Sequence, residues 1–118
     1  MTSVSTPATW LAGYIADIPT PFDDNGGIDL AAFAGLCERQ IRAGVSAILV
    51  SETGGEASTL SPAEQESIIR TAVEVAQGRI RVVAGAGSNS TSQAIELTQR
   101  AEAAGADAVL SVVPYYNK

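Results

Sequence analysis

Residues 47–64 read AILVSETGGEASTLSPAE, and they decide the fold because they join a strand, a polar loop and the start of a helix. Residues 47–50 are continuously apolar, which is typical of a short parallel strand buried on both faces. Ser61-Pro62-Ala63-Glu64 supplies an N-cap, a proline at the first helical position and the glutamate of a capping box. The helix that begins there is expected to reach about Gln77 and to end at Gly78.

The same alternation of compact apolar runs and longer amphipathic runs continues on both sides of this stretch. Hydrophobic periodicity predicts further strands over residues 14–18, 80–84 and 108–113. It also predicts a helix over residues 30–43 with Asp29 as its N-cap, and another that Ser90 or Thr91 caps and that continues to Ala104. The predicted order is therefore β-α-β-α-β-α-β.

Two α/β architectures are built from such units, because each return to a parallel strand needs a crossover helix. One is an open doubly wound sheet and the other is a closed eight-stranded barrel. A barrel normally needs ~250 residues, so these residues would supply about half of one. We expect residues 1–12 to be a lead and residues 13–118 to form four parallel strands and three helices, truncated after the fourth strand. Two edge strands would then be unpaired.

Composition excludes several functional classes. The formal net charge of −6, with Lys118 as the only lysine, argues against a nucleic-acid partner. Histidine is absent, which removes the commonest zinc ligand, and we expect neither a metal nor a cofactor. Cys37 is the single cysteine and lies in an apolar helical pattern, so we interpret it as a buried hydrophobe. Without a positively charged leader or a long apolar run, the chain is expected to be cytoplasmic and not to enter a membrane.

The loop after the second strand is the richest in candidate functional groups. In both architectures such groups gather at the carboxyl ends of the strands. Gly54 and Gly55 let backbone amides approach an anion such as a small carboxylate, and Thr53 adds a hydroxyl beside them. A tight turn in which Thr53 caps the backbone explains the same pattern. Glu56 is expected to orient the loop by accepting backbone hydrogen bonds.

The loops after the third and fourth strands carry weaker signals. Residues 85–90 read GAGSNS and match a dinucleotide-binding fingerprint poorly, because Ser90 stands at the third glycine position. We expect these glycines to permit close strand–helix packing and Asn89 to hydrogen-bond across neighbouring loops. Tyr115 and Tyr116 could relay a proton or stack across a subunit contact, although aromatic packing within the loop is the simpler interpretation.

Together these motifs resemble the dihydrodipicolinate synthase and N-acetylneuraminate lyase family, from about residue 13 to residue 118. The resemblance rests on four segments in order: Thr20-Pro21-Phe22; Thr53-Gly54-Gly55-Glu56-Ala57 with Thr59-Leu60-Ser61; Gly85-Ala86-Gly87-Ser88-Asn89-Ser90-Thr91; and Pro114-Tyr115-Tyr116-Asn117-Lys118. It implies a (β/α)8 TIM barrel that acts as a class I aldolase-type lyase. In such enzymes a lysine on the sixth strand forms a Schiff base with pyruvate, and the enamine condenses with aspartate semialdehyde in lysine biosynthesis.

The resemblance also implies roles for particular residues. Thr53 and Tyr116 match two members of a proton-relay triad, and the tyrosine is donated into the site of a neighbouring subunit. Tyr115 matches a residue that packs at the tight dimer interface and, in regulated members, takes part in binding lysine. Gly54 and Gly55 fall where the carboxylate of pyruvate is held. The full-length protein is accordingly expected to be a homodimer or a homotetramer.

Several positions depart from the family pattern. Synthases usually have Gly-Thr-Thr-Gly-Glu, whereas this chain has Glu52 at the first position and Gly54 at the third. One hydroxyl is lost from the carboxylate site and one negative charge is added beside it. Asn89 matches a lysine-binding position of regulated members, but Gln65 and Gln93 replace more acidic or imidazole-bearing residues. These changes leave the second substrate and lysine inhibition open.

The largest departure concerns the Schiff-base lysine, which the resemblance places beyond residue 118. Lys118 does not match it, so we expect these residues alone to have no aldolase activity. Two alternatives to a synthase stay open. The parent protein could be a pyruvate-dependent sugar-acid aldolase or dehydratase of the same family, or the chain could be a non-catalytic, truncated fragment that dimerises.

Overall fold

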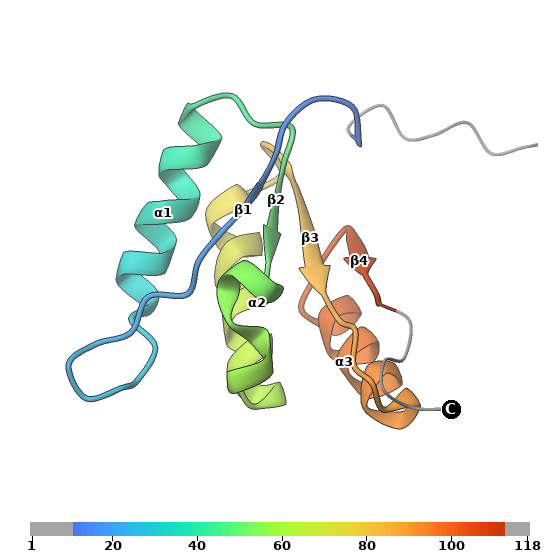
Figure 1. The fold of residues 1–118 in the computed structure, drawn as a ribbon. Helices are drawn as coiled ribbons and strands as arrows, with labels where there is room; N and C mark the ends of the chain where they lie inside the picture. Colours follow the sequence, from blue (N-terminus) through green and yellow to red (C-terminus); the bar gives the residue numbers. More distant parts are fainter. Residues whose placement is uncertain (1–10, 113–118) are drawn as a thin grey trace, which may run out of the picture.

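The computed structural model describes residues 11–112, without the side chain of Thr53, and shows a four-stranded sheet with three α-helices (Figure 1). Two short 3-10 helices, η2 and η3, lie between the second strand and the second α-helix. In chain order the elements are β1 (Ile15–Asp17), α1 (Leu30–Arg42), β2 (Ala47–Val50), η2 (Thr53–Gly55), η3 (Ala57–Thr59), α2 (Pro62–Ala76), β3 (Arg81–Gly85), α3 (Thr91–Ala103) and β4 (Ala108–Leu110).

The sheet has the strand order β1-β2-β3-β4, and every neighbouring pair is parallel. The register places Asp17 beside Leu49, Leu49 beside Val83, and Val83 beside Ala108. The predicted alternation of strands and helices is therefore confirmed. The first and last strands are shorter than predicted, and β4 ends at Leu110.

The capping residues set the helix boundaries as predicted. The side chain of Asp29 accepts a hydrogen bond from the amide of Ala32 at 2.9 Å at the start of α1. Ser61 and Glu64 form a complete capping box at the start of α2. For α3, Ser90 is the N-cap, which decides between the two predicted candidates. Each side chain replaces a backbone partner that the first helical turn lacks.

The main core lies between the helices and the sheet. Its fully buried side chains include Phe33, Ile48, Ile68 and Val82, which come from α1, β2, α2 and β3. Cys37 belongs to the same cluster, and burial raises the pKa of its thiol to about 12. A thiol with so high a pKa stays protonated near neutral pH, so the interpretation of Cys37 as a buried hydrophobe is confirmed.

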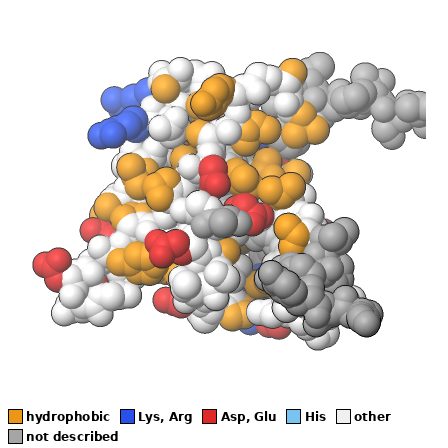
Figure 2. Space-filling view, viewed as in Figure 1, with side chains coloured by type: hydrophobic (Ala, Val, Ile, Leu, Met, Phe, Trp, Pro, Cys, Tyr) orange, Lys and Arg blue, Asp and Glu red, His pale blue; other side chains and the backbone are white. Residues whose placement is uncertain are grey.

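The edge strand β4 is more exposed to solvent than the central strands β2 and β3. Val109, Leu110 and the following Val112 are 39%, 44% and 43% exposed, although β2 and β3 are mostly buried. The face seen in Figure 2 carries hydrophobic side chains over the middle of the molecule, with acidic groups between them. Within residues 11–112, no helix is both long enough and apolar enough to cross a lipid bilayer.

Candidate active site

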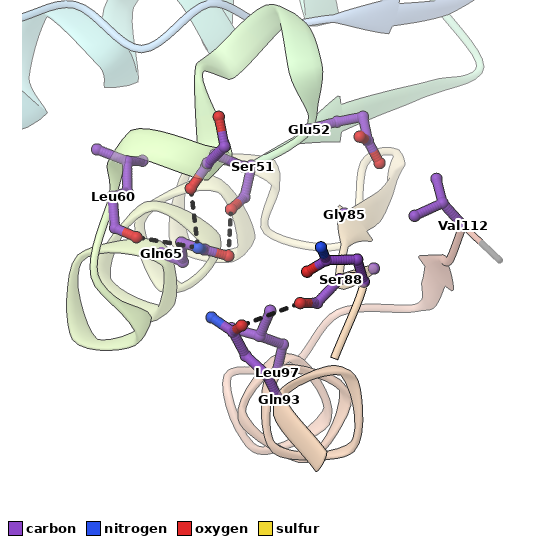
Figure 3. Close-up of a pocket in the computed structure, with 13 residues that line it drawn as sticks. Ser51, Glu52, Leu60, Gln65, Gly85, Ser88, Gln93, Leu97 and Val112 are labelled. Carbon is purple, nitrogen blue, oxygen red and sulfur yellow. Dashed lines mark hydrogen bonds between the residues drawn. The ribbon is translucent and has the colours of Figure 1, made fainter. Parts of the chain in front are cut away.

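A cavity of about 430 Å³ opens where β2, β3 and β4 end (Figure 3). Its walls come from the loops after these strands and from the first turns of α2 and α3. Ser51 and Glu52 follow β2, Gly87 and Asn89 follow β3, and Val112 follows β4. Because the strands are parallel, their carboxyl ends meet at one rim, as the sequence predicted for its candidate loops.

The loop after β2 folds as two successive 3-10 turns. The amide of Gly55 donates to the carbonyl of Glu52 at 2.9 Å, and the buried hydroxyl of Thr20 donates to the carbonyl of Gly55 at 2.6 Å. The loop is thereby tied to the segment that follows β1. Because the turn already uses the Gly55 amide, this amide would have to leave Glu52 before it could hold an anion.

Gly54 lies directly against an acidic side chain of β1. A Cβ built on Gly54 would lie 2.5 Å from Oδ2, 2.8 Å from Cγ and 3.0 Å from Oδ1 of Asp17. A larger residue, such as the threonine usual in synthases, therefore fits here only if Asp17 moves. Sequence reasoning missed Asp17, because nothing in its local pattern says that it faces the loop after the next strand.

Glu56 does not orient the loop in the way that we expected. Its side chain is exposed and makes no capping hydrogen bond to η3. Its backbone carbonyl instead accepts hydrogen bonds from the amide and the hydroxyl of Thr59, at 2.9 and 2.8 Å. Glu56 adopts a left-handed backbone conformation with φ 59°, so the backbone turn sets the loop direction.

A buried amide side chain holds the same loop from the other side. Gln65, in the first turns of α2, accepts a hydrogen bond from the hydroxyl of Ser51 at 3.2 Å. It donates to the carbonyls of Ala57 and Leu60 at 3.0 and 3.2 Å (Figure 3). The only signal for this arrangement in the sequence is a polar residue inside an otherwise apolar helical face.

Gly85, the last residue of β3, and Gly87, in the loop after it, have a different role from the predicted one. A Cβ on Gly85 would fall on the carbonyl oxygen of Ser51, and a Cβ on Gly87 would lie 2.6 Å from the amide nitrogen of Val112. Both glycines therefore permit neighbouring strand ends to approach one another. The expectation of close strand–helix packing was wrong, because the tight contacts run sideways between loops.

The structure places the predicted site residues only in part. The backbone of Thr53 lies in η2 at the rim, and Asn89 lines the cavity. Tyr115 and Tyr116 lie outside the described residues. Val112, which precedes them, lies at the same rim as the loop after β2. The proposed roles of Thr53, Gly54, Gly55, Asn89 and the two tyrosines stay predictions.

Comparison with known proteins supplies the wider context. A 4-hydroxy-tetrahydrodipicolinate synthase of Bartonella quintana is 52% identical over 108 residues, which are 92% of this chain and 37% of that protein. A dihydrodipicolinate synthase from Acinetobacter baumannii, solved in complex with pyruvate, superposes with a TM-score of 0.86 at 47% identity. That match covers 90% of this chain and 36% of the other.

A structure described as the first monomeric dihydrodipicolinate synthase variant matches with a TM-score of 0.88 at 40% identity, over 96% of this chain and 37% of that one. The chain thus spans well under half the length of its relatives, and its four strands and three helices match the N-terminal part of their barrel. The model of the dihydrodipicolinate synthetase family matches residues 10–118. With the shared fold and the loops at the strand ends, this match shows that the chain belongs to the dihydrodipicolinate synthetase family.

Proposed function

We propose that the chain forms the N-terminal strands of a lyase that condenses pyruvate, held as a Schiff base, with aspartate semialdehyde. The observation that carries this proposal is the position of the Thr53 loop. It lies at the carboxyl ends of parallel strands, where its flanking residues Ser51 and Ala57 border the cavity with the ends of β3 and β4. Gly54 and Gly55, beside Thr53, lie instead against Asp17 and Thr20 on the side of β1. Residues of such a rim can reach one bound keto acid together. The names of the relatives and the pyruvate complex of one of them support the same chemistry.

The proposed reaction needs an amine, an acid–base relay and a carboxylate site. A lysine amine adds to the keto carbon of pyruvate, water leaves, and loss of a methyl proton gives an enamine that attacks the aldehyde carbon. In the proposal the hydroxyl of Thr53 and the phenol of Tyr116 pass the protons. Gly54 and Gly55 border the carboxylate of pyruvate. The lysine belongs to the sixth strand of such a barrel, beyond the four strands described here.

The proposal extends to subunit contacts and regulation. Tyr115 and Tyr116 would lie at a dimer interface, in a homodimer or homotetramer, and Asn89 would belong to a regulatory position beside it. Asn89 lines the cavity between the loops, which is where a small effector could reach both β2 and β3. Because one matching structure is a monomeric variant, the assembly needs a direct measurement of mass in solution.

A second candidate within the family is a sugar-acid aldolase or dehydratase. The contact between Asp17 and Gly54 favours it. A carboxylate here stands close to the position where synthases usually have a hydroxyl, and it can accept hydrogen bonds from the hydroxyls of a polyhydroxylated second substrate. The two candidates share the Schiff base and differ in the second substrate.

A chimera tests both candidates. In it, residues 10–118 replace the matching segment of the Bartonella quintana relative, which supplies the remaining strands. Pyruvate and borohydride should then trap an irreversible adduct on one lysine, detected by mass spectrometry. The 118-residue chain alone should give no adduct, since Lys118 does not match the nucleophile. Turnover with aspartate semialdehyde against hydroxylated aldehydes distinguishes a synthase from a sugar-acid aldolase.

The unmodified relative serves as the control for the chemistry, and circular dichroism verifies that the chimera folds. A folded chimera that forms no adduct under conditions in which the relative does would contradict both candidates. It would favour the third possibility, a non-catalytic segment.

A further inference from the structure

We propose that Gln65 is a positioning residue that fixes the loop carrying Thr53. The functional part of this inference rests on the proposed lyase activity, whereas the structural part does not. Gln65 belongs to α2, and its hydrogen bonds go to Ser51, Ala57 and Leu60, not to the described part of Thr53 or to the glycines beside it. It acts on them through the segment that joins β2 to α2.

The hydrogen bonds of Gln65 bracket that segment at both ends. Its carbonyl oxygen holds the hydroxyl of Ser51, which lies two residues before Thr53. Its amide nitrogen holds the carbonyls of Ala57 and Leu60, which lie at the start of η3 and immediately after it. One side chain therefore fixes the entry to the loop and the turn that closes it.

The hydrogen bonds of Gln65 are costly to lose because the side chains that make them are buried. Gln65 is 6% exposed and Ser51 is 1% exposed, so water can replace a lost partner only from the side of the cavity that both residues line. A buried polar group without a partner is costly, so the loop must move to find one when Gln65 is removed. Ser51 also has a φ of 58°, a conformation that a non-glycine residue adopts only when its surroundings enforce it. The hydrogen bond to Gln65 is one of the contacts that enforce it.

The start of α2, from which the side chain of Gln65 extends, is itself held by hydrogen bonds. Glu64 and Ser61 exchange hydrogen bonds at 2.8 and 3.1 Å, which fixes the first turn of α2 immediately before Gln65. The neighbouring helix carries a counterpart without these properties. Gln93, at the start of α3, holds the hydroxyl of Ser88 at 2.9 Å but is exposed. Gln93 is thus a matched control on the opposite wall of the same cavity.

Amide hydrogen exchange tests the structural part. Gln65→Met removes all three hydrogen bonds at similar volume, and Gln65→Glu keeps the acceptor while removing the donor. Both should lower the protection of the hydrogen-bonded amides of Gly55, Ala57 and Leu60 by roughly tenfold, as expected for the loss of ordinary hydrogen bonds. For Gln65→Glu this loss should diminish at low pH, because a protonated carboxyl regains a donor. Gln65→Met should show no such recovery.

Kinetics of the chimera test the functional part. Both substitutions should lower kcat by roughly ten- to hundredfold, because small displacements of a relay group slow the reaction more than they weaken binding, so the KM for pyruvate should change less. Gln99→Met, at an exposed position of α3, is the control for activity, and Gln93→Met is the control for exchange in residues 53–60.

Protection of the loop within twofold of wild type in both Gln65 variants would overturn the inference. An equal loss of amide protection in residues 53–60 of the Gln93→Met variant would also overturn the inference, because it would show that any change in the cavity wall destabilises the loop. If the unsubstituted chimera forms no pyruvate adduct, the proposed lyase activity fails. The exchange measurements on the 118-residue chain and on the chimera still decide whether Gln65 fixes the conformation of the loop.

Discussion

The loops after β2 and β3 line one cavity but are held in different ways. Both end in a serine N-cap, and both contain a serine hydroxyl bound to a glutamine of the following helix. The loop after β2 contains two 3-10 turns and two left-handed non-glycine residues, and a buried glutamine of α2 binds three partners in it. The loop after β3 is short, and its glycines press against neighbouring strand ends. The first loop is held mainly by buried polar contacts, whereas the second combines exposed polar contacts with the close steric approach of its glycines.

The largest expected effect tests steric proximity. Gly85→Ala should destabilise the chain by about 3 kcal/mol, because the new Cβ meets the backbone carbonyl of Ser51, which cannot move aside as a side chain could. Urea unfolding measures the loss. Gly35→Ala on α1, where a Cβ meets nothing within 4 Å, should instead stabilise by about 0.5–1 kcal/mol. A Gly85→Ala variant as stable as the Gly35→Ala variant would show that the close approach of Gly85 to Ser51 does not constrain the end of β3.

The contact between Asp17 and Gly54 should give the next largest effect. Gly54→Thr alone is expected to cost about 1 kcal/mol, because the exposed Asp17 carboxylate must rotate away from the new side chain. Asp17→Ala should cost little alone and should recover most of that loss in the double variant. Thermal and urea unfolding of the four proteins give the coupling free energy. Additive costs would show that Asp17 and Gly54 do not constrain each other.

The two N-caps should differ more modestly. Ser61→Ala should cost about 1 kcal/mol, because Ser61 belongs to a reciprocal capping box. Ser90→Ala should cost about 0.5 kcal/mol, because its hydroxyl accepts from the amide of Gln93 at a long 3.5 Å. Helix content by circular dichroism during urea unfolding reports both changes. A larger cost at Ser90 would reverse the ranking of polar support in the two loops.

The sequence predicted the helices, the strands and the shared rim because these depend on local signals. Asp29 and Ser61 are recognisable as caps within a few residues, and the apolar runs are recognisable as buried strands. The approach of Gly85 to Ser51, and of Gly54 to Asp17, depends on which strands are neighbours and how far apart their ends lie. No local pattern encodes that distance.

Gln65 shows that the same limit applies to hydrogen bonds between side chains and loops. The sequence marked it as a departure from regulated relatives, and its helical position was correct. Its three partners became visible only with the loop conformation, because Ser51 has a left-handed backbone that its own residue type does not favour. Residues 53–60 were therefore the least predictable part of the described chain, although their composition pointed most directly to chemistry.

The consecutive strand order has a consequence for synthesis on the ribosome. Each strand pairs with the strand made immediately before it, so a newly emerged βα unit meets a partner that is already complete. The sheet can therefore grow one unit at a time in the direction of translation, with β4 as the open growing edge. Nascent chains stalled at successive lengths should acquire protease resistance in steps that follow completion of β2, β3 and β4.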